Sequence, residues 1–425
     1  MTADESAAQT TTANRPAPRW LTRGSASAIA LLATVYLAGP FLFTASEGRG
    51  LRPRYHIDFD VYVKGGEAFL RGENLYTQDY EVGGITLPFT YPPFSALLFS
   101  PFHFLGVDVG ALVLNILTII LLWAMSAILI GRLWPSTTQS YWSPGYLALA
   151  TLPLWVILES VMSTLGFAQV NVFLAFLIVA DLAAKRLPFP RGILVGLAAA
   201  IKLTPAVFGL YFLVKKDFKA AAISIASGVF WTGLMWLISP TNSAQYWLHT
   251  LHDPGRIGGM GYAMNQSLNG TFVRLFQGAT PTEERLWQVS AVVVVILAAV
   301  AMRRAFAANR PMEAMVLNSL VALLCSPISW SHHWVWLGVA LIVLAKNFSD
   351  FPTTFNKWFF AATLLVAVGG THRFLPQSNN VEFSWNAAQT LIGNTYVLWA
   401  VFYLVVAALA PQLLRRAAPE AQSQP

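Results

Sequence analysis

The sequence contains a single cysteine, Cys325, and few charged residues for a chain of 425 residues. One cysteine excludes an intrachain disulfide framework and argues against a metal site built from cysteines. Charged residues make up 11% of the chain, whereas soluble domains average roughly 25%. With 56% hydrophobic residues and a mean hydropathy of +0.54, this deficit argues against a soluble globular enzyme and excludes a disordered chain.

The positive charge is not gathered in one patch. The formal charge of +7 comes from 27 Lys and Arg residues against 20 Asp and Glu residues. A nucleic-acid-binding protein is expected to concentrate such an excess on one face. Here the basic residues form small clusters between apolar runs, which is typical of the cytoplasmic loops of membrane proteins. We therefore predict a multi-pass protein of the cell membrane that binds no nucleic acid.

Apolar runs dominate the chain. One membrane crossing needs roughly 20 apolar residues, and ten runs approach that length. We predict an all-α polytopic bundle of about ten spanning helices, with a disordered cytoplasmic tail at 1–24, a membrane domain at 25–414 and a second cytoplasmic tail at 415–425. The ten runs lie at 26–46, 107–131, 145–162, 165–184, 218–239, 286–302, 312–328, 333–346, 358–371 and 390–413.

One further apolar run, 192–214, is interrupted by Lys202 and Pro205. If this run enters and leaves by the same face, the basic clusters and both termini all lie on the cytoplasmic side. We therefore predict two half-helices that meet near residues 202–205. The alternative is one tilted helix kinked at Pro205, which would place the lysines at 215–219 outside.

This topology places residues 47–106, 240–285 and 372–389 on the outer face, where most of the acidic residues also lie. Because acidic residues contribute little to membrane topology, their bias indicates an extracytoplasmic polar site. In the first of these segments, Asp58 and Asp60 begin a predicted amphipathic helix on the outer membrane surface. Asp58 is positioned to act as a general base. Asp60 is a candidate substrate-binding residue, with simple helix capping as the alternative.

Four further polar residues in or beside the apolar runs are candidate substrate-binding residues. Consecutive prolines hold Tyr91 at the membrane interface, either as the wall of a groove or as an aromatic belt residue. Gln169 and Asn171 lie near the outer end of their run, where polar side chains indicate function. Lys202 is the only base deep in an apolar run, and it either extends toward the interface or binds a phosphate.

The remaining candidates are amides and histidines in later segments. Asn265 and Gln266 lie in a glycine-rich loop at 259–270, where amides could bind sugar hydroxyls, although the same composition suits any exposed loop. His332 and His333 follow proline and serine residues at the outer boundary, and one of the two could bind a phosphate. Their adjacent spacing does not match a metal motif with ligands at i and i+4, so we predict no metal.

Taken in order, these segments resemble the actinobacterial polyprenyl-phosphate-mannose-dependent α-1,2-mannosyltransferases, which belong to the GT-C superfamily of membrane glycosyltransferases. The resemblance covers about residues 26–413. The segments that carry it are Asp58-x-Asp60-Val61-Tyr62, Pro88-Phe89-Thr90-Tyr91-Pro92-Pro93, Gln169-Val170-Asn171, Lys202-Leu203-Thr204-Pro205, Asn265-Gln266-Ser267-Leu268 and Ser326-Pro327-Ile328-Ser329-Trp330-Ser331-His332-His333.

The resemblance implies that the membrane domain is a GT-C catalytic domain, and we predict no cofactor. It implies a polyprenyl-phosphate-mannose donor in the outer leaflet of the bilayer. It also implies a glycolipid acceptor: a phosphatidylinositol mannoside, lipomannan or lipoarabinomannan. An acidic residue of the first outer loop serves as base in this family, and Asp58 matches it. Many relatives have glycine before the Gln-x-Asn triplet, where this chain has Ala168.

The chemistry of the residues agrees with this resemblance. A β-linked mannosyl phosphate that gives an α-linked product must react with inversion. A single displacement needs one base, for which Asp58 is the candidate, and stabilisation of the departing phosphate by Lys202, His332 or His333.

Two other classes of protein stay open at this point. A GT-C arabinofuranosyltransferase would use a lipid-linked arabinose donor on a similar fold. A transporter or flippase should show broken helices in corresponding positions of two halves, and only one run is broken here.

Overall fold

The computed structural model describes residues 22–46, 50–139 and 141–415. These residues fold mainly into helices, with two short β-hairpins. The predicted tails at 1–24 and 415–425 fall almost entirely outside the described residues, so the domain boundaries stay a prediction.

Among the described residues, four helices are long and apolar enough to cross a membrane. Each matches one predicted apolar run. They are α1 (Arg23–Leu42), α4 (Val107–Leu133), α10 (Phe218–Ile238) and α13 (Pro281–Ala307). The run predicted at 26–46 is too long, because the helix ends at Leu42 and the chain continues as strand β1 (Phe43–Ser46).

Two helix pairs could each form one further, bent span. Helix α5 (Pro144–Val156) meets α6 (Glu159–Phe167) at 81°, and α17 (Ala387–Gly393) meets α18 (Thr395–Leu409) at 69°. The predicted run at 145–162 is therefore not one straight helix. Pro153 removes a helical hydrogen bond from the last turn of α5, where the chain bends. The described residues thus contain four to six candidate spans, and about ten crossings stays a prediction.

The other helices are shorter. They are α2 (Ile57–Leu70), α3 (Pro93–His103), α7 (Asn171–Ala183), α8 (Ile193–Ile201), α9 (Gly209–Lys215), α11 (Pro240–Leu248), α12 (Leu268–Leu275), α14 (Pro311–Cys325), α15 (Trp336–Asp350) and α16 (Thr354–Gly369). The 3₁₀ helices are η1 (Pro135–Gln139), η2 (Thr204–Phe208), η3 (Thr250–His252), η4 (Pro254–Ile257), η5 (Ser331–Val335), η6 (Thr371–Phe374), η7 (Val381–Ser384) and η8 (Pro411–Leu413).

Two antiparallel hairpins complete the fold. Strand β1 pairs with β2 (Gly50–Pro53), and β3 (Asp79–Val82) pairs with β4 (Ile85–Pro88). The second hairpin leads directly into the proline-rich segment before α3, so it orients Tyr91.

The run at 192–214 is broken where the sequence predicts. Helix α8 ends at Ile201, and Lys202 adopts an extended conformation with φ −147° and ψ 132°. The chain resumes helical geometry at Thr204, followed by Pro205, whose ring cannot continue an uninterrupted α-helix. This break presents the Lys202 side chain at a gap between two short helices. Entry and exit by the same membrane face stays a prediction.

Helix α2 is present and ends at Leu70, as predicted. Its apolar side packs on α3, and the approach is so close that a Cβ on Gly66 would lie 2.8 Å from the Cα of Ser100. This contact with protein accounts for the buried face of α2 without a membrane. A position flat on the membrane surface is therefore not established.

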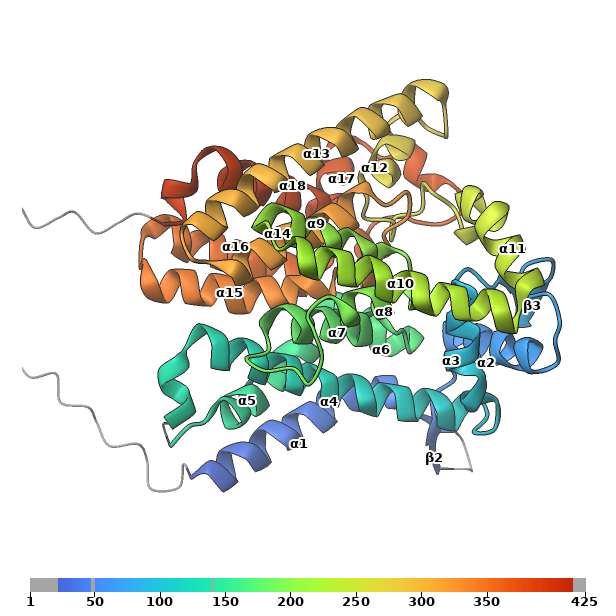
Figure 1. Ribbon diagram of the computed structural model, residues 1–425, viewed down its shortest axis with the longest axis horizontal. Coiled ribbons are helices and arrows are strands. Elements are labelled where there is room, and N and C mark those ends of the chain that lie inside the picture. The colour runs from blue at the N-terminus through green and yellow to red at the C-terminus, as the bar shows by residue number, and fades with distance from the viewer. Residues whose placement is uncertain (1–21, 47–49, 140, 416–425) are drawn as a thin grey trace, which may run out of the picture.

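Several outer-face segments lie together in space. Figure 1 shows α2, α3, α11 and β3 gathered at one end of the molecule, away from the end where α1 begins. The predicted topology assigns all four to the outer side, so their common location agrees with it.

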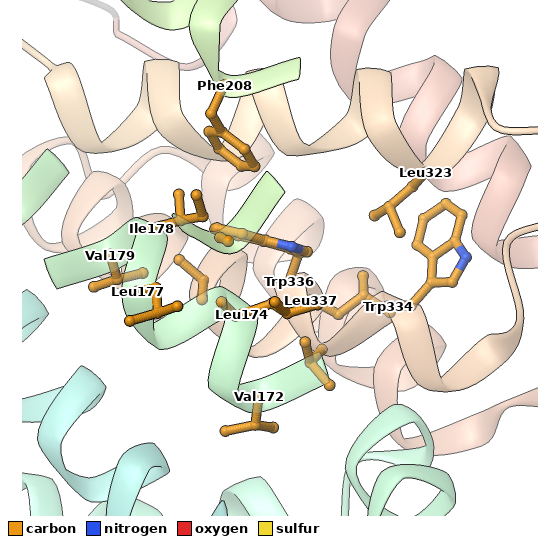
Figure 2. Packing of buried hydrophobic residues seen from close by; sticks show 14 of the residues in the cluster. Val172, Leu174, Leu177, Ile178, Val179, Phe208, Leu323, Trp334, Trp336 and Leu337 are labelled. Atoms are coloured by element: carbon orange, nitrogen blue, oxygen red, sulfur yellow. The ribbon is translucent and has the colours of Figure 1, made fainter. Parts of the chain in front are cut away.

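A hydrophobic cluster lies behind the broken helix. Figure 2 shows Phe208 of η2 above Trp336 of α15, with Ile178 and Leu174 of α7 and Leu323 of α14 beside them. The Phe208 and Trp336 rings stack with centroids 5.1 Å apart. Among membrane helices, where lipid is as apolar as these side chains, close van der Waals packing holds such a cluster together. The cluster therefore fixes η2 and the start of α15, the two segments that flank Lys202 and His333.

The predicted orientation can be tested by cysteine labelling. In a variant whose Cys325 is replaced by serine, a membrane-impermeant thiol reagent applied to intact cells should label Asp79→Cys and Asp253→Cys but not Lys216→Cys. Labelling of position 216 from outside would show that the run at 192–214 crosses the membrane.

Candidate active site

Asp58 lies in the first turn of α2, and the start of this helix is firmly held. The residue that precedes the helix is His56, whose imidazole contacts the main-chain oxygens of Phe41 and Arg54. Its side chain makes no capping hydrogen bond, and neither acidic residue takes that position. Asp60 therefore makes no side-chain capping hydrogen bond, although it lies in the first turn, where the helix dipole favours a carboxylate. The contact of His56 with Phe41 joins the start of α2 to the end of α1.

The carboxylate of Asp58 is joined to two tyrosines through one amide. The Gln169 side-chain nitrogen donates to Asp58 Oδ2. The Gln169 oxygen accepts hydrogen bonds from the hydroxyls of Tyr62 at 2.7 Å and Tyr91 at 3.1 Å. Tyr62 was missed as a site residue, although its position four residues after Asp58 places both on one face of α2.

Lys202 and His333 lie next to each other across the break in the helix. The ammonium Nζ of Lys202 donates to His333 Nε2 at 2.8 Å and to Asn171 Oδ1 at 3.3 Å. The same nitrogen lies 5.2 Å from the centre of the Tyr91 ring. The residues predicted in four separate segments therefore meet at one cation.

The side chain of His332 points in a different direction from that of His333. Its ring is buried against Phe167, with centroids 5.7 Å apart, and its Nε2 has no hydrogen-bond partner within the described residues. Its main-chain oxygen accepts from Thr164 at 3.2 Å. Both histidines line the cavity described below, but only His333 contacts Lys202.

A buried glutamate holds the segment that carries the histidines. Glu159 accepts hydrogen bonds from Ser331 at 2.9 Å and from Tyr396 at 2.7 Å, and His372 lies 3.7 Å away. Ser331 directly precedes His332, so this carboxylate anchors η5. Its presence within an apolar run is the sequence feature that could have identified it.

These side chains line one cavity of about 510 Å³. Such a volume lies within the roughly 300–1,000 Å³ of small-molecule sites. Six predicted residues line it: Asp58, Tyr91, Gln169, Lys202, His332 and His333. Asn171 lies behind Lys202 and lines a smaller cavity of about 50 Å³. Asp60, Asn265 and Gln266 do not line the main cavity.

Asp60 faces away from the cavity. Its carboxylate accepts from the Tyr55 hydroxyl at 2.7 Å and lies 3.8 Å from Lys64. Side chains two residues apart on a helix point in different directions, which explains why Asp58 and Asp60 have different surroundings.

Asn265 and Gln266 are fully buried in the framework of the second outer loop. Asn265 donates to the main-chain oxygens of Met260 and Pro327 and accepts from the Ser329 amide at 2.9 Å. Gln266 donates to the oxygens of Ala263 and Gly393, both at 2.8 Å. These bonds pin the loop to the segment that leads into η5.

The electrostatic surroundings of Asp58 suit a base. Burial raises the pKa of Asp58 to about 6, while the hydrogen bond from Gln169 and the charge of Lys202 act in the opposite direction. A carboxyl with this pKa is ionised at neutral pH and is more basic than an exposed aspartate.

The rest of the cavity wall is divided into an apolar and a polar part. The apolar part, from η2, α14 and the segment after it, is formed by Leu203, Val207, Val321, Ala322, Cys325 and Ile328. The polar part includes Asp253, Arg256 and Trp330, which were not predicted as site residues. Within the described residues, no group of three or more His, Cys, Asp or Glu side chains could hold a metal ion.

The structure thus combines four to six candidate membrane spans with a cavity lined by a carboxylate and a lysine, which are features of a multi-pass membrane enzyme. Residues 89–327 match the family described as Glycosyltransferase family 87. The chain belongs to this family and is a glycosyltransferase of the GT-C type. The matched range contains all predicted site residues except Asp58, Asp60, His332 and His333.

Curated relatives extend the likeness over most of the chain. The chain is 36% identical over 368 residues to a Mycobacterium tuberculosis protein named polyprenol-phosphate-mannose-dependent alpha-(1-2)-phosphatidylinositol mannoside mannosyltransferase, covering 84% of this chain and 85% of that protein. It is 36% identical over 380 residues to a protein of the same name from Mycolicibacterium smegmatis, covering 84% of each.

A third relative has a longer acceptor in its name. It is the polyprenol-phosphate-mannose-dependent alpha-(1-2)-phosphatidylinositol pentamannoside mannosyltransferase of M. smegmatis, 35% identical over 286 residues, covering 66% of this chain and 67% of that protein. No solved structure gives a significant match.

The framework role of Asn265 predicts a stability defect. Asn265→Ala leaves the Ser329 amide and the Met260 carbonyl without their partner, and each unsatisfied buried group costs about 1–3 kcal/mol. We expect a lower melting temperature in detergent, with unchanged KM values for the protein that stays folded. Gln288→Ala, a surface amide on α13, is the control and should lie within about 0.5 kcal/mol of the unaltered protein. Normal stability with a raised acceptor KM would instead assign Asn265 to substrate binding.

Proposed function

We propose that this chain transfers mannose from polyprenyl-phosphate-mannose to a phosphatidylinositol mannoside, or to a related acceptor such as lipomannan, and forms an α-1,2 linkage with inversion. The observation that carries the proposal is the shared cavity of Asp58 and Lys202, a base and a cation with an apolar wall beside them. The names of the 36% identical relatives support the donor and the acceptor class.

Asp58 is the proposed base. The oxygen of the acceptor 2-hydroxyl attacks the anomeric carbon of the donor mannose while its proton passes to the Asp58 carboxylate. The bond between that carbon and the phosphate oxygen breaks, and the electron pair leaves with the lipid phosphate. One new glycosidic bond replaces one mannosyl phosphate bond. Gln169 keeps the carboxylate in place through its hydrogen bond and is itself held by Tyr62 and Tyr91.

Lys202 is the proposed ligand of the phosphate. Its ammonium is held beside His333 and Asn171 before any substrate arrives, so little reorganisation is needed when the phosphate gains charge. The ammonium would face the oxygens of the departing phosphate. When His333 Nε2 carries a proton, that N–H would face them as well. Lys202 Nζ lies 2.8 Å from His333 Nε2, and an ammonium can only donate in such a contact.

The apolar part of the cavity wall suits the lipid chain of the donor. Leu203, Val207, Val321 and Ala322 line the same cavity as Lys202. A polyprenyl chain would be buried along these side chains, while its phosphate reaches the cation. We place this site on the outer face of the cell membrane, in line with the predicted topology.

A donor comparison tests the proposed function. Purified protein in detergent should transfer mannose from polyprenyl-phosphate-mannose to a phosphatidylinositol mannoside, detected by mass spectrometry as one added hexose. Decaprenyl-phosphate-arabinose with the same acceptor should give no product. Transfer of a pentose, or no transfer from either donor, would contradict the proposal.

The role of Asp58 predicts a large loss of rate. Asp58→Asn keeps the shape and can still hydrogen-bond Gln169, but it removes the basicity. Because general-base assistance is worth about 10²–10⁴-fold, transfer should fall at least about 10²-fold, with near-normal expression and donor binding. Asp60→Asn is the control and should cost much less, since Asp60 faces away from the cavity. Near-full activity of Asp58→Asn would refute the single-base mechanism.

The raised pKa of Asp58 predicts a pH profile. The base works only when ionised, so kcat/KM should rise with pH through about 6 and fall as the pH drops below that value. Gln169→Leu removes a hydrogen bond that favours the ionised form and should move the midpoint to higher pH. Asp60→Asn should leave it in place. A profile that is flat between pH 5 and pH 8, roughly the range where a base of this pKa must titrate, would contradict this assignment.

A further inference from the structure

The water-facing rim of the cavity carries polar side chains that the mechanism above does not use. Asp253 and Arg256 come from the short segment of η3 and η4 in the second outer loop, and both line the cavity. Asp253 is exposed, and the Arg256 side chain is 24% exposed. Trp330 lines the same cavity from the segment before η5. These three residues therefore lie between bulk water and the cavity interior.

Trp330 is rigidly held. Its main chain pairs with Asn265 in a β-bridge, and its main-chain oxygen accepts from the His333 amide at 2.8 Å. The loop of Arg256 packs directly on its ring, because a Cβ on Gly258 would lie 3.1 Å from the indole. The framework around Asn265 thus fixes the main chain that carries the indole, and the Tyr262 ring contacts the indole itself, with centroids 6.1 Å apart. One turn of chain connects Trp330 to the proposed phosphate site.

Arg256 keeps most of its hydrogen-bonding capacity. Within the described residues its guanidinium makes one ion pair, 3.9 Å from Asp79, and no hydrogen bond. Asp79 is 55% exposed, and exposed ion pairs of this kind contribute little. A guanidinium has five N–H donors in a planar fork. Those donors are therefore available to a ligand at the rim.

We propose that Arg256, Asp253 and Trp330 form a subsite for a neutral sugar ring of the acceptor. The guanidinium fork and the Asp253 carboxylate bind adjacent hydroxyls of the ring, as donor and acceptor respectively. The indole covers the apolar C–H face of the same ring. This inference rests on the proposed function and identifies what holds the acceptor while Asp58 takes its proton.

The division of the cavity supports a sugar at this place. The donor phosphate has its own cation in Lys202, which lies beside the apolar wall. A carboxylate next to Arg256 would repel a second phosphate, whereas it can accept hydrogen bonds from sugar hydroxyls. The acceptor ring therefore extends from the rim toward Asp58. It meets the donor mannose between the rim and Lys202.

The test uses octyl α-D-mannopyranoside, an acceptor without a phosphate, and the purified full chain. Arg256→Gln removes the fork, and Arg256→Lys keeps only the charge. Because sites built to bind hydroxyls lose much affinity without their partner, each variant should raise the KM for this acceptor about 10-fold or more. The KM for polyprenyl-phosphate-mannose should change less than about twofold. Arg71→Gln, at an exposed arginine directly after α2 and outside the cavity, is the control and should change neither value.

Two results would overturn the subsite. One is an unchanged acceptor KM in both Arg256 variants with normal melting temperatures. The other is a defect seen only with a phosphatidylinositol mannoside and not with the octyl glycoside, since Arg256 would then bind the phosphate of the lipid. Acceptor binding by saturation-transfer NMR separates this inference from the proposed function. Binding that is lost in Arg256→Gln would support the subsite even if the unaltered protein transferred no mannose, a result that would refute only the function.

Discussion

The active site depends on one side-chain amide. Gln169 donates to the carboxylate of Asp58 and accepts from two buried tyrosines, so it joins α2, the proline-rich segment before α3 and the junction of α6 and α7. A buried carboxylate without a partner would be costly, and it would neutralise by protonation instead. The amide hydrogen bond and the Lys202 charge keep the pKa of Asp58 near 6 despite burial, which leaves a base that is ionised at neutral pH.

The break in the membrane helix at Lys202 serves the same arrangement. A lysine within an intact apolar helix would have to extend toward water. Here Lys202 has left helical geometry, and its ammonium donates hydrogen bonds to two polar neighbours, His333 and Asn171. The aromatic cluster of Phe208 and Trp336 supports both sides of the gap, and Glu159 anchors η5 through Ser331. The Lys202 ammonium is thus held by the packing of Phe208 on Trp336 and, through Ser331 and η5, by the buried carboxylate of Glu159.

The sequence allowed part of this site to be predicted. Gln169 and Lys202 could be selected because polar groups in apolar runs are expensive. Asp58 and His333 could be selected by their predicted position at the outer boundary, and all four line one cavity. Asn265 and Gln266 could not be classified, because amides in a glycine-rich loop look alike whether they bind sugar or pin the chain. The bend between α5 and α6 was missed, since periodicity does not reveal where an apolar run changes direction. Ala168 adopts φ 49°, a left-handed conformation that glycine adopts more easily and that the sequence alone does not reveal.

The central claim is a single displacement in which one base, Asp58, acts on the acceptor while Lys202 receives the leaving phosphate. The most direct measurement is the anomeric configuration of the bond formed from β-linked polyprenyl-phosphate-mannose, determined by the one-bond C–H coupling of the new mannose in the purified product. The account predicts an α-1,2 linkage, formed with inversion. A β-linked mannose would mean retention through two displacements, which one base in this cavity does not explain, and it would contradict the account.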